Sequence, residues 1–350
     1  MDRAHAADVL LVSLGSTEGL RRADDELQDS LRRAGARVAI ARPYPPEPLP
    51  TLMLTDLLWA RAAREAATKI LEQQRRAPAR AVIYSSTTAA LLWPRSGAIR
   101  FDATAAGNRR GRHGLWQRPL ERRRLRQAPL LLPWSEGGLR EAPDGATRGD
   151  RALLLPVPVE PSGPLDGERD VAAVTYAANP SKKGLDRVLA AWRRLLAERS
   201  DADGPALELV VAGASDAQLQ GAGLVSPGEP GLRVVGSLIP ADFRALLRRA
   251  RVFVCAPRRE DYGIAQLEAL ADGCQLVTTR APGPYAALPI ARQLDPRLVD
   301  DDLLRGLRAA LRSPLEDYGE RAREALAPFS REAVDRLVAE QLLPRLLGRG

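Results

Sequence analysis

The stretch that most constrains the fold runs from Arg251 to Thr279. Its first part, Val252–Cys255, is a short apolar run of the kind found in strands buried on both faces. Helical spacing follows over Gly263–Ala271, and Gly273 is a natural helix stop. Leu276–Thr278 then resumes a strand. The order strand, loop, helix, strand predicts a parallel α/β sheet.

Glu268 is the unusual residue of this stretch. It shares an apolar helical stripe with Ile264, Leu267 and Ala271, where an unpaired carboxylate is costly. Glu260 lies in the preceding loop, with seven residues between the two glutamates. One interpretation is an ordinary surface Glu260 and a Glu268 paired with an arginine. The other is a binding site, in which the helix start receives an anion and Glu268 accepts hydrogen bonds from sugar hydroxyls. The position at a strand end of an α/β pattern favours the binding site.

The run E-D-Y-G-I-A-Q-L-E-A-L-A-D-G resembles the Glu-x7-Glu segment of glycosyltransferase family 4, whose members are retaining nucleotide-sugar enzymes with the GT-B fold. The resemblance implies an α/β chain with two Rossmann-like domains facing a cleft. It places Glu260 at the transferred sugar, with a catalytic role, and Glu268 at the ribose of the nucleotide. It also implies that Gly263 and Ile264, at the helix start, contact the diphosphate.

Composition sets broad limits. The 350 residues are enough for two domains, and 45% apolar with 27% charged residues is typical of a soluble protein. No membrane-spanning run or signal pattern is visible, and Cys255 and Cys274 do not make a disulfide framework, so we expect a cytoplasmic protein. With only His5 and His113, a histidine metal centre or a Ser-His-Asp triad has little support.

The basic charge is concentrated in one window. Ten arginines lie between Arg95 and Arg126 against Asp102 and Glu121, so this window carries 10 − 2 = +8, equal to the net charge of the whole chain. A nucleic-acid partner is not expected, because no binding module and few stacking aromatics accompany the arginines.

Three interpretations of this window, Arg95–Arg126, stay open. It would contact an anionic membrane peripherally at its inner face, with Leu115 and Trp116 as apolar anchors. It would bind a phosphorylated acceptor or the donor phosphates. Alternatively it is a solvated face with internal acidic partners.

Two positions in the N-terminal half are candidate site residues. Asp8–Leu14 reads as a strand followed by Gly15 and Ser16, a loop that would receive a ligand or simply form a tight turn. In the resembling family this loop faces the interdomain cleft. Asp102 follows the predicted strand Ala98–Phe101, where α/β sites collect.

The family often has a histidine near the acceptor at the end of that strand, and here Phe101 occupies the place. Asp102 would substitute for it as a catalytic group, or the acceptor needs no side-chain base.

Lys183 is the candidate phosphate ligand of the C-terminal half. The chain has only three lysines, and two of them stand in the predicted loop Asn179–Gly184, between a strand and the helix Leu185–Ala197. A lysine before a helix start is a suitable point charge for a phosphate, although a surface loop is the alternative. The family has Lys-Gly here, so the resemblance places Lys183 and Gly184 at the donor diphosphate.

One family feature of this loop is missing. The arginine usual five residues before the lysine is replaced by Ala178. That contact is therefore absent, or it is supplied by Arg258, Arg259 or the arginine-rich window.

We expect three segments: an acceptor-side domain over 1–160, a nucleotide-sugar domain over 161–329, and a C-terminal helix over 330–350 that returns to the first domain. Within the second, Ile290–Leu294 reads as a last strand. The resemblance implies retaining, metal-independent transfer from a nucleoside diphosphate sugar, with no cofactor. The acceptor, base and sugar stay unidentified. The alternative is an inactive GT-B-fold protein that binds a nucleotide or glycan, which Ala178 and Phe101 favour.

Overall fold

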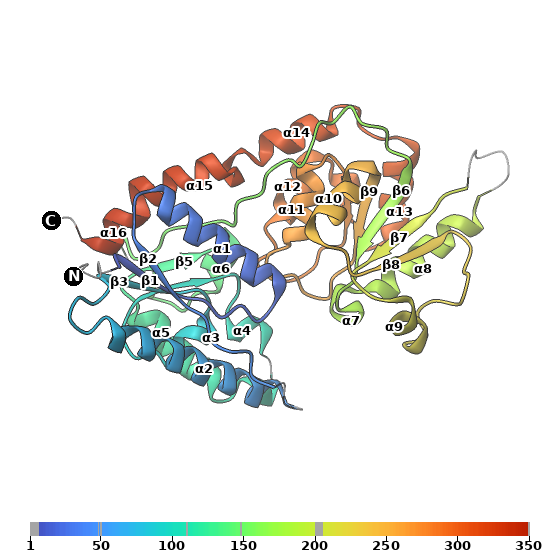
Figure 1. Ribbon diagram of the computed structural model, residues 1–350. Coiled ribbons are helices and arrows are strands. Elements are labelled where there is room, and N and C mark those ends of the chain that lie inside the picture. The colour runs from blue at the N-terminus through green and yellow to red at the C-terminus, as the bar shows by residue number, and fades with distance from the viewer. Residues whose placement is uncertain are drawn as a thin grey trace. The chain divides into compact units, whose positions relative to one another are not determined.

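The computed structural model describes residues 7–47, 49, 51–109, 111–147, 149–199 and 206–348. The chain forms two compact units: unit 1 comprises Met1–Pro158 and Phe329–Gly350, and unit 2 comprises Val159–Pro328. Each unit is built on a five-stranded parallel sheet flanked by helices (Figure 1).

The sheet of unit 1 has the strand order β2-β1-β3-β4-β5. Its short strands are almost wholly apolar, as expected when helices cover both faces. The strands are β1 (Val9–Val12), β2 (Val38–Ala41), β3 (Ala81–Tyr84), β4 (Ala98–Phe101) and β5 (Leu131–Pro133). The helices are α1 (Glu18–Arg33), α2 (Leu52–Gln73), α3 (Thr87–Ala90), α4 (Ala105–Asn108), the 3-10 turn η1 (Gly111–Gly114), α5 (Gln117–Gln127) and α6 (Glu136–Glu141).

Alternation along β1 divides the core of unit 1 into two layers. Leu10 and Val12 face the layer that α2 and α5 cover, in which Leu125 is buried. Val9 and Leu11 face the opposite layer, which α1 and the C-terminal helices cover. The C-terminal helices are α15 (Arg331–Leu337), the π-helical segment η5 (Val338–Leu342) and α16 (Leu343–Leu347).

Unit 2 repeats this architecture with the strand order β10-β9-β6-β7-β8. The strands are β6 (Val171–Tyr176), β7 (Leu209–Ala212), β8 (Leu232–Gly236), β9 (Ala250–Cys255) and β10 (Gln275–Thr278). The helices are α7 (Pro180–Lys183), α8 (Leu185–Ala197), α9 (Asp216–Gly221), α10 (Pro240–Arg249), α11 (Ile264–Ala271), α12 (Ala287–Leu294), η3 (Pro296–Leu298), α13 (Leu303–Arg312), α14 (Tyr318–Ala325) and η4 (Ala327–Phe329). The chain leaves β6 toward β7 on one side and later returns to β9 on the other. The strand order therefore reverses at the β6–β9 pair, where α/β sheets bind ligands at their carboxyl ends.

Two expectations for secondary structure are wrong. Residues 290–294 belong to helix α12 and not to a strand, because an apolar run of this length does not distinguish the two by its periodicity. The loop at 179–184 contains one helical turn, α7. Its Asn179 side chain accepts from the Lys182 N–H, and Pro180 occupies the first helical position.

None of the described helices is both long and apolar enough to cross a bilayer.

Candidate functional site

Three loops meet at the carboxyl end of the unit 2 sheet, one after each of β6, β9 and β10. The Arg258 N–H donates to the Lys182 carbonyl at 3.0 Å, which joins the first loop to the second. The Glu260 N–H donates to the Pro282 carbonyl at 3.0 Å, which joins the second to the third. These backbone contacts fix the loops that carry the predicted donor residues.

Glycine at two positions permits this close approach. Gly184 has φ +64°, and a Cβ there would lie 1.9 Å from the Ala256 carbonyl oxygen. Gly263, at the start of α11, has φ +92°, and a Cβ there would lie 2.9 Å from Cε2 of Tyr285. Both positions combine a left-handed backbone with a neighbour that leaves no room for a side chain.

Lys183 and Glu260 form an ion pair at the centre of these loops. The Lys183 Nζ lies 2.7 Å from Glu260 Oε2, and the Gln266 Nε2 donates to the same oxygen at 3.0 Å. The Glu260 side chain is 6% exposed and that of Lys183 is 22% exposed. The structure therefore brings together the two residues that the family resemblance assigns to the sugar and to the diphosphate.

A second lysine–carboxylate pair stands directly beside the first. The Lys182 Nζ lies 3.1 Å from Asp261 Oδ2, and the Lys182 side chain is 51% exposed. Arg259 also donates to Asp261, at 2.8 Å. Arg258 donates to both oxygens of Asp186 at 2.9 Å. Arg258 and Arg259 were the candidates to replace the phosphate contact missing at Ala178. In the structure both of them are paired with carboxylates.

Glu268 is buried on α11, with 4% of its surface exposed. Its Oε1 lies 3.9 Å from Nη1 of Arg244, which is longer than a hydrogen bond. Arg244 donates instead to both oxygens of Asp272, at 2.6 and 2.8 Å. Glu268 is therefore not turned to solvent, and it is paired with an arginine as one of the two interpretations expected, through a 3.9 Å ion pair without a hydrogen bond.

Gln266 is a polar residue of the site that sequence reasoning missed. It is 2% exposed, and its Oε1 has no hydrogen-bond partner among the described residues. Its Nε2 reaches Glu260 and also lies 3.8 Å from the Cys255 sulfur. The available signal was that α11 contains only two polar side chains, Gln266 and Glu268, in an otherwise apolar helix.

Cys255, Thr278 and Tyr285 continue the polar contacts beneath Gln266. The Cys255 sulfur lies 3.5 Å from the Tyr285 hydroxyl, which lies 3.1 Å from Thr278 Oγ1. Burial raises the pKa of the Cys255 thiol and of the Tyr285 hydroxyl, so both groups are protonated at neutral pH. These neutral groups support Gln266 without adding charge to the site.

The other predicted site residues lie in unit 1, at the carboxyl ends of its strands. Gly15 and Ser16 follow β1, and the Gly15 carbonyl accepts from Arg21 at 2.9 Å. Asp102 follows β4 and accepts from the Ala103 N–H at 2.8 Å. Phe101, in the place of the family histidine, is 1% exposed and belongs to the core.

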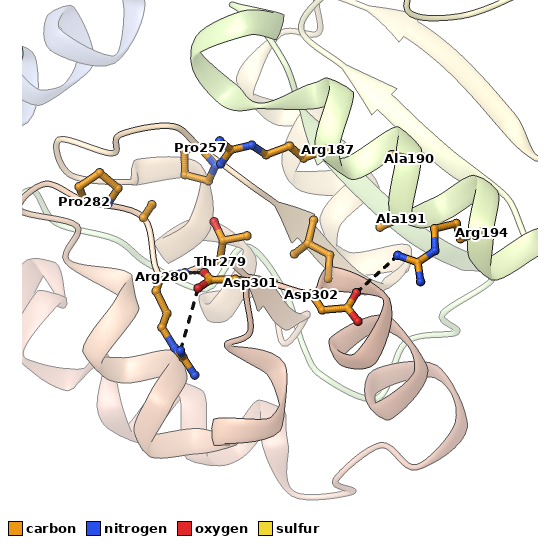
Figure 2. A pocket seen from close by; sticks show the side chains of 12 residues that line it. Arg187, Ala190, Ala191, Arg194, Pro257, Thr279, Arg280, Pro282, Asp301 and Asp302 are labelled. Carbon is orange, nitrogen blue, oxygen red and sulfur yellow. Dashed lines mark hydrogen bonds and ion pairs between the residues drawn. The ribbon is translucent and has the colours of Figure 1, made fainter.

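A pocket of about 520 Å³ also opens in unit 2 (Figure 2). It borders the loops after β9 and β10 through Pro257 and Thr279, but none of Lys183, Glu260 and Glu268 lines it. Charged side chains across it face one another, with Arg280 Nη1 4.0 Å from Asp301 Oδ2 and Arg194 Nη1 3.9 Å from Asp302 Oδ1. The pocket is therefore separate from the Lys183–Glu260 pair.

Known proteins resemble the chain in both sequence and structure. Residues 169–317, within unit 2, match the family model described as "Glycosyl transferases group 1". The solved structure of WaaG, a glycosyltransferase involved in lipopolysaccharide biosynthesis, matches 97% of this chain and 100% of its own, at a TM-score of 0.68 and 17% identity. The chain has the GT-B fold.

Two further GT-B structures agree. Sucrose-phosphate synthase from Thermosynechococcus elongatus has a TM-score of 0.70 at 16% identity, with 98% of this chain and 99% of that one covered. HepE of Anabaena, solved in complex with UDP and glucose, has a TM-score of 0.67 at 11% identity, with 96% and 99% covered. No curated protein matches the sequence.

Proposed function

We propose that this chain is a retaining glycosyltransferase of family 4, which moves a sugar from a nucleoside diphosphate sugar to an acceptor still to be identified. The contact of Lys183 with Glu260 carries the proposal. It joins the ends of β6 and β9, where the strand order reverses, and it lies beside α11, which holds Glu268. The match of unit 2 to the group 1 glycosyl transferases supports the same reaction class.

The donor would bind along α11. Its diphosphate would take the helix start at Gly263 and Ile264, where free N–H groups and the helix dipole favour an anion. Lys183 would supply the cation, with Gly184 keeping the two loops close, and Glu268 would accept the ribose hydroxyls. In the free chain Glu260 neutralises Lys183, so donor binding exchanges one anionic partner of the lysine for another.

The chemistry would then need little more than positioning and charge. The bond from the sugar's anomeric carbon to the diphosphate breaks, and a bond to the acceptor oxygen forms on the same face. The acceptor proton passes to the leaving phosphate. Lys183 stabilises that phosphate, and preorganised groups of this kind contribute about 2.7–4 kcal/mol at comparable sites. Glu260 stabilises the positive charge that develops on the sugar. The reaction uses no cofactor, and we expect it to need no metal.

Unit 1 would supply the acceptor side. Gly15, Ser16 and Asp102 all stand at the carboxyl ends of its strands, where α/β sheets bind ligands. Because Phe101 is buried, the side chain in the place of the family histidine cannot reach an acceptor. Asp102 would then bind and orient the acceptor hydroxyl, whose proton passes to the leaving phosphate.

The second candidate function is a binding protein of the same fold without turnover. Ala178 removes one phosphate contact, and Phe101 removes a polar group from the acceptor side. Such a protein would keep the Glu268 contact with the ribose and lose only the transfer.

A donor panel separates the two. UDP and its hexoses come first, since a GT-B neighbour was solved with UDP and glucose, followed by the GDP and ADP sugars. Melting temperature measures binding, because a ligand of the native state raises it. Release of the nucleoside diphosphate measures turnover.

The proposed enzyme shows both effects with one donor, and Glu260→Gln keeps the thermal shift while losing release. A thermal shift without release, in the presence of a wide acceptor panel, identifies the binding protein. The absence of both would overturn the donor site itself. Free thiols and a nucleotide-sugar donor both suit the cytoplasm, where we propose the enzyme works.

A further inference from the structure

The arginine-rich window divides into structural and free arginines. Arg100 is 1% exposed, lies 3.7 Å from Asp24 and stacks on Trp134. Arg109 binds Asp56 at 2.6 Å. Others serve neighbouring backbone: Arg95 donates to the Ala79 and Arg80 carbonyls, and Arg124 donates to the Leu91 carbonyl while it stacks on Trp93. Arg110 lies outside the described residues.

The free arginines form one surface on α5. Arg122, Arg123 and Arg126 line a concavity of about 510 Å³, together with Arg118, Pro119 and Gln127. All three are exposed. Within the described ranges no carboxylate lies at ion-pair distance from any of the three. Their positive charge is therefore left to solvent or to an external anion.

Exposed apolar side chains gather in the same unit. Six large apolar residues of the described chain are exposed, and five of them belong to unit 1: Tyr44 at 91%, Leu49 at 40%, Leu52 at 55%, Leu54 at 43% and Leu115 at 62%. Helix α2 begins Leu-Met-Leu-Thr-Asp-Leu-Leu-Trp, in which six of eight residues are apolar. A water-facing helix start does not need this composition, which is instead typical of a surface that another apolar phase covers.

Two sets of contacts join the chain segments that carry these leucines to helix α5, which carries the arginines. The Asp56–Arg109 pair ties the N-terminal part of α2 to the segment that leads into η1, and α2 packs against η1 itself. Arg118 of α5 donates to the Gly111 and Gly114 carbonyls of the same turn. Leu115 stands between that turn and α5. Helices α2 and α5 also cover the same face of the sheet (Figure 1).

We propose that this surface of unit 1 docks on an anionic lipid bilayer. Leu52, Leu54 and Leu115 enter the apolar boundary of the membrane, and the α5 arginines contact the lipid phosphates. Charge and apolar area each add to such binding, and both are present here. A nucleic acid is less suitable, because bases stack on aromatic side chains and four of the five exposed apolar residues of unit 1 are leucines.

Flotation with lipid vesicles tests the proposal. The full chain should float with vesicles rich in phosphatidylglycerol and remain below those of pure phosphatidylcholine. Each arginine at an anionic surface contributes about fivefold to binding, so the variant R122Q/R123Q/R126Q should bind on the order of a hundredfold more weakly. The variant L52S/L54S/L115S should also bind more weakly, and moderate salt should release what remains of its binding.

A matched control removes the same charge elsewhere. R233Q/R305Q/R312Q changes three exposed arginines of unit 2, so the net charge falls equally. This control variant should float like the unchanged protein. The melting temperatures of all the variants should equal that of the unchanged protein, which shows that each of them is folded. Equal losses in the two arginine variants would show a response to net charge alone and overturn the surface. Absence of flotation at low salt, or tighter binding to a single-stranded oligonucleotide than to the vesicles, would also overturn it.

Discussion

The two units use their cationic side chains in opposite ways. In unit 2, Lys183 at the carboxyl end of the sheet and Arg244 on α10 turn inward onto Glu260 and Asp272, residues that are 5% and 0% exposed. On α5 of unit 1, Arg122, Arg123 and Arg126 turn outward, away from any described carboxylate. Inward cations hold loops and helix ends in one geometry. Outward cations contribute little to the stability of the fold and remain available to bind a partner.

The largest expected effect comes from the inward side. Asp272→Asn keeps the shape of the side chain but leaves the largely buried Arg244 guanidinium with only the more distant Glu268 carboxylate, 3.9 Å away. Removing one member of a buried pair costs about 3–5 kcal/mol of unfolding free energy, which urea denaturation measures. The control is Asp170→Asn, whose partner Arg249 is 56% exposed, and it should be close to neutral. Equal losses of unfolding free energy in the two variants would mean that Glu268 replaces Asp272 as the ion partner of Arg244. The buried pair would then contribute no more than the exposed one.

The next effect compares two adjacent lysines of the same loop. Lys183→Met should lower kcat/KM for the donor that the panel selects by about a hundredfold to a thousandfold, because the leaving phosphate loses its cation. Lys182→Met removes a more exposed lysine from a pair with Asp261 and should change kcat/KM little. If Lys182→Met lowered kcat/KM more than Lys183→Met, the donor phosphate would bind at Lys182, beside Asp261, and not at Lys183, beside Glu260.

The sequence predicted the buried elements of the fold better than the short ones. Strand β4 and helix α8 have the predicted bounds, because their apolar patterns are unambiguous. Helix α12 was mistaken for a strand over five residues, and α7 was missed although Asn179 and Pro180 are ordinary signals for a helix start. Short elements contain too few side chains for a period to show.

The sequence predicted the site residues whose type is unusual for their surroundings. It did not predict the contacts between residues that are far apart in the chain. Glu268 was visible as a carboxylate among apolar residues, and Lys183 as a lysine in an arginine-rich chain. The ion pair of Lys183 with Glu260 was not, since it joins residues 77 positions apart. Asp272 was passed over because a polar residue beside a helix end is ordinary until its burial is known.

A third prediction tests α5 on its inner face, opposite the free arginines. Burial raises the pKa of Glu121 to about 7, although both of its oxygens accept from the Ala105 N–H. The folded chain therefore holds this proton more tightly than the unfolded chain, and stability falls as pH rises from 4.5 through 7. The difference corresponds to about 3 kcal/mol.

Glu121→Gln removes that titration. The difference in unfolding free energy between the variant and the unchanged protein should move in the variant's favour by about this amount between pH 4.5 and pH 8. Urea unfolding at the two pH values measures it. Asp8→Asn is a control that should not change with pH over this range, since Arg37 lowers the pKa of Asp8 and its titration lies at lower pH. A difference that does not change with pH would mean that Glu121 is ionised in the fold and that α5 carries charge on both faces.

The smallest expected effect is the one that defines the outward side. Replacing Arg122, Arg123 and Arg126 by Gln together should change the unfolding free energy by no more than about 0.5 kcal/mol, as at surface sites without partners. Any shift should be toward higher stability, because like charges one turn apart on a helix repel one another. Raising the salt concentration should shrink the shift, since salt screens exposed charges. A loss of several kcal/mol would show that these arginines hold α5 in place. The distinction between inward cations, which stabilise the fold, and outward cations, which do not, would then be wrong.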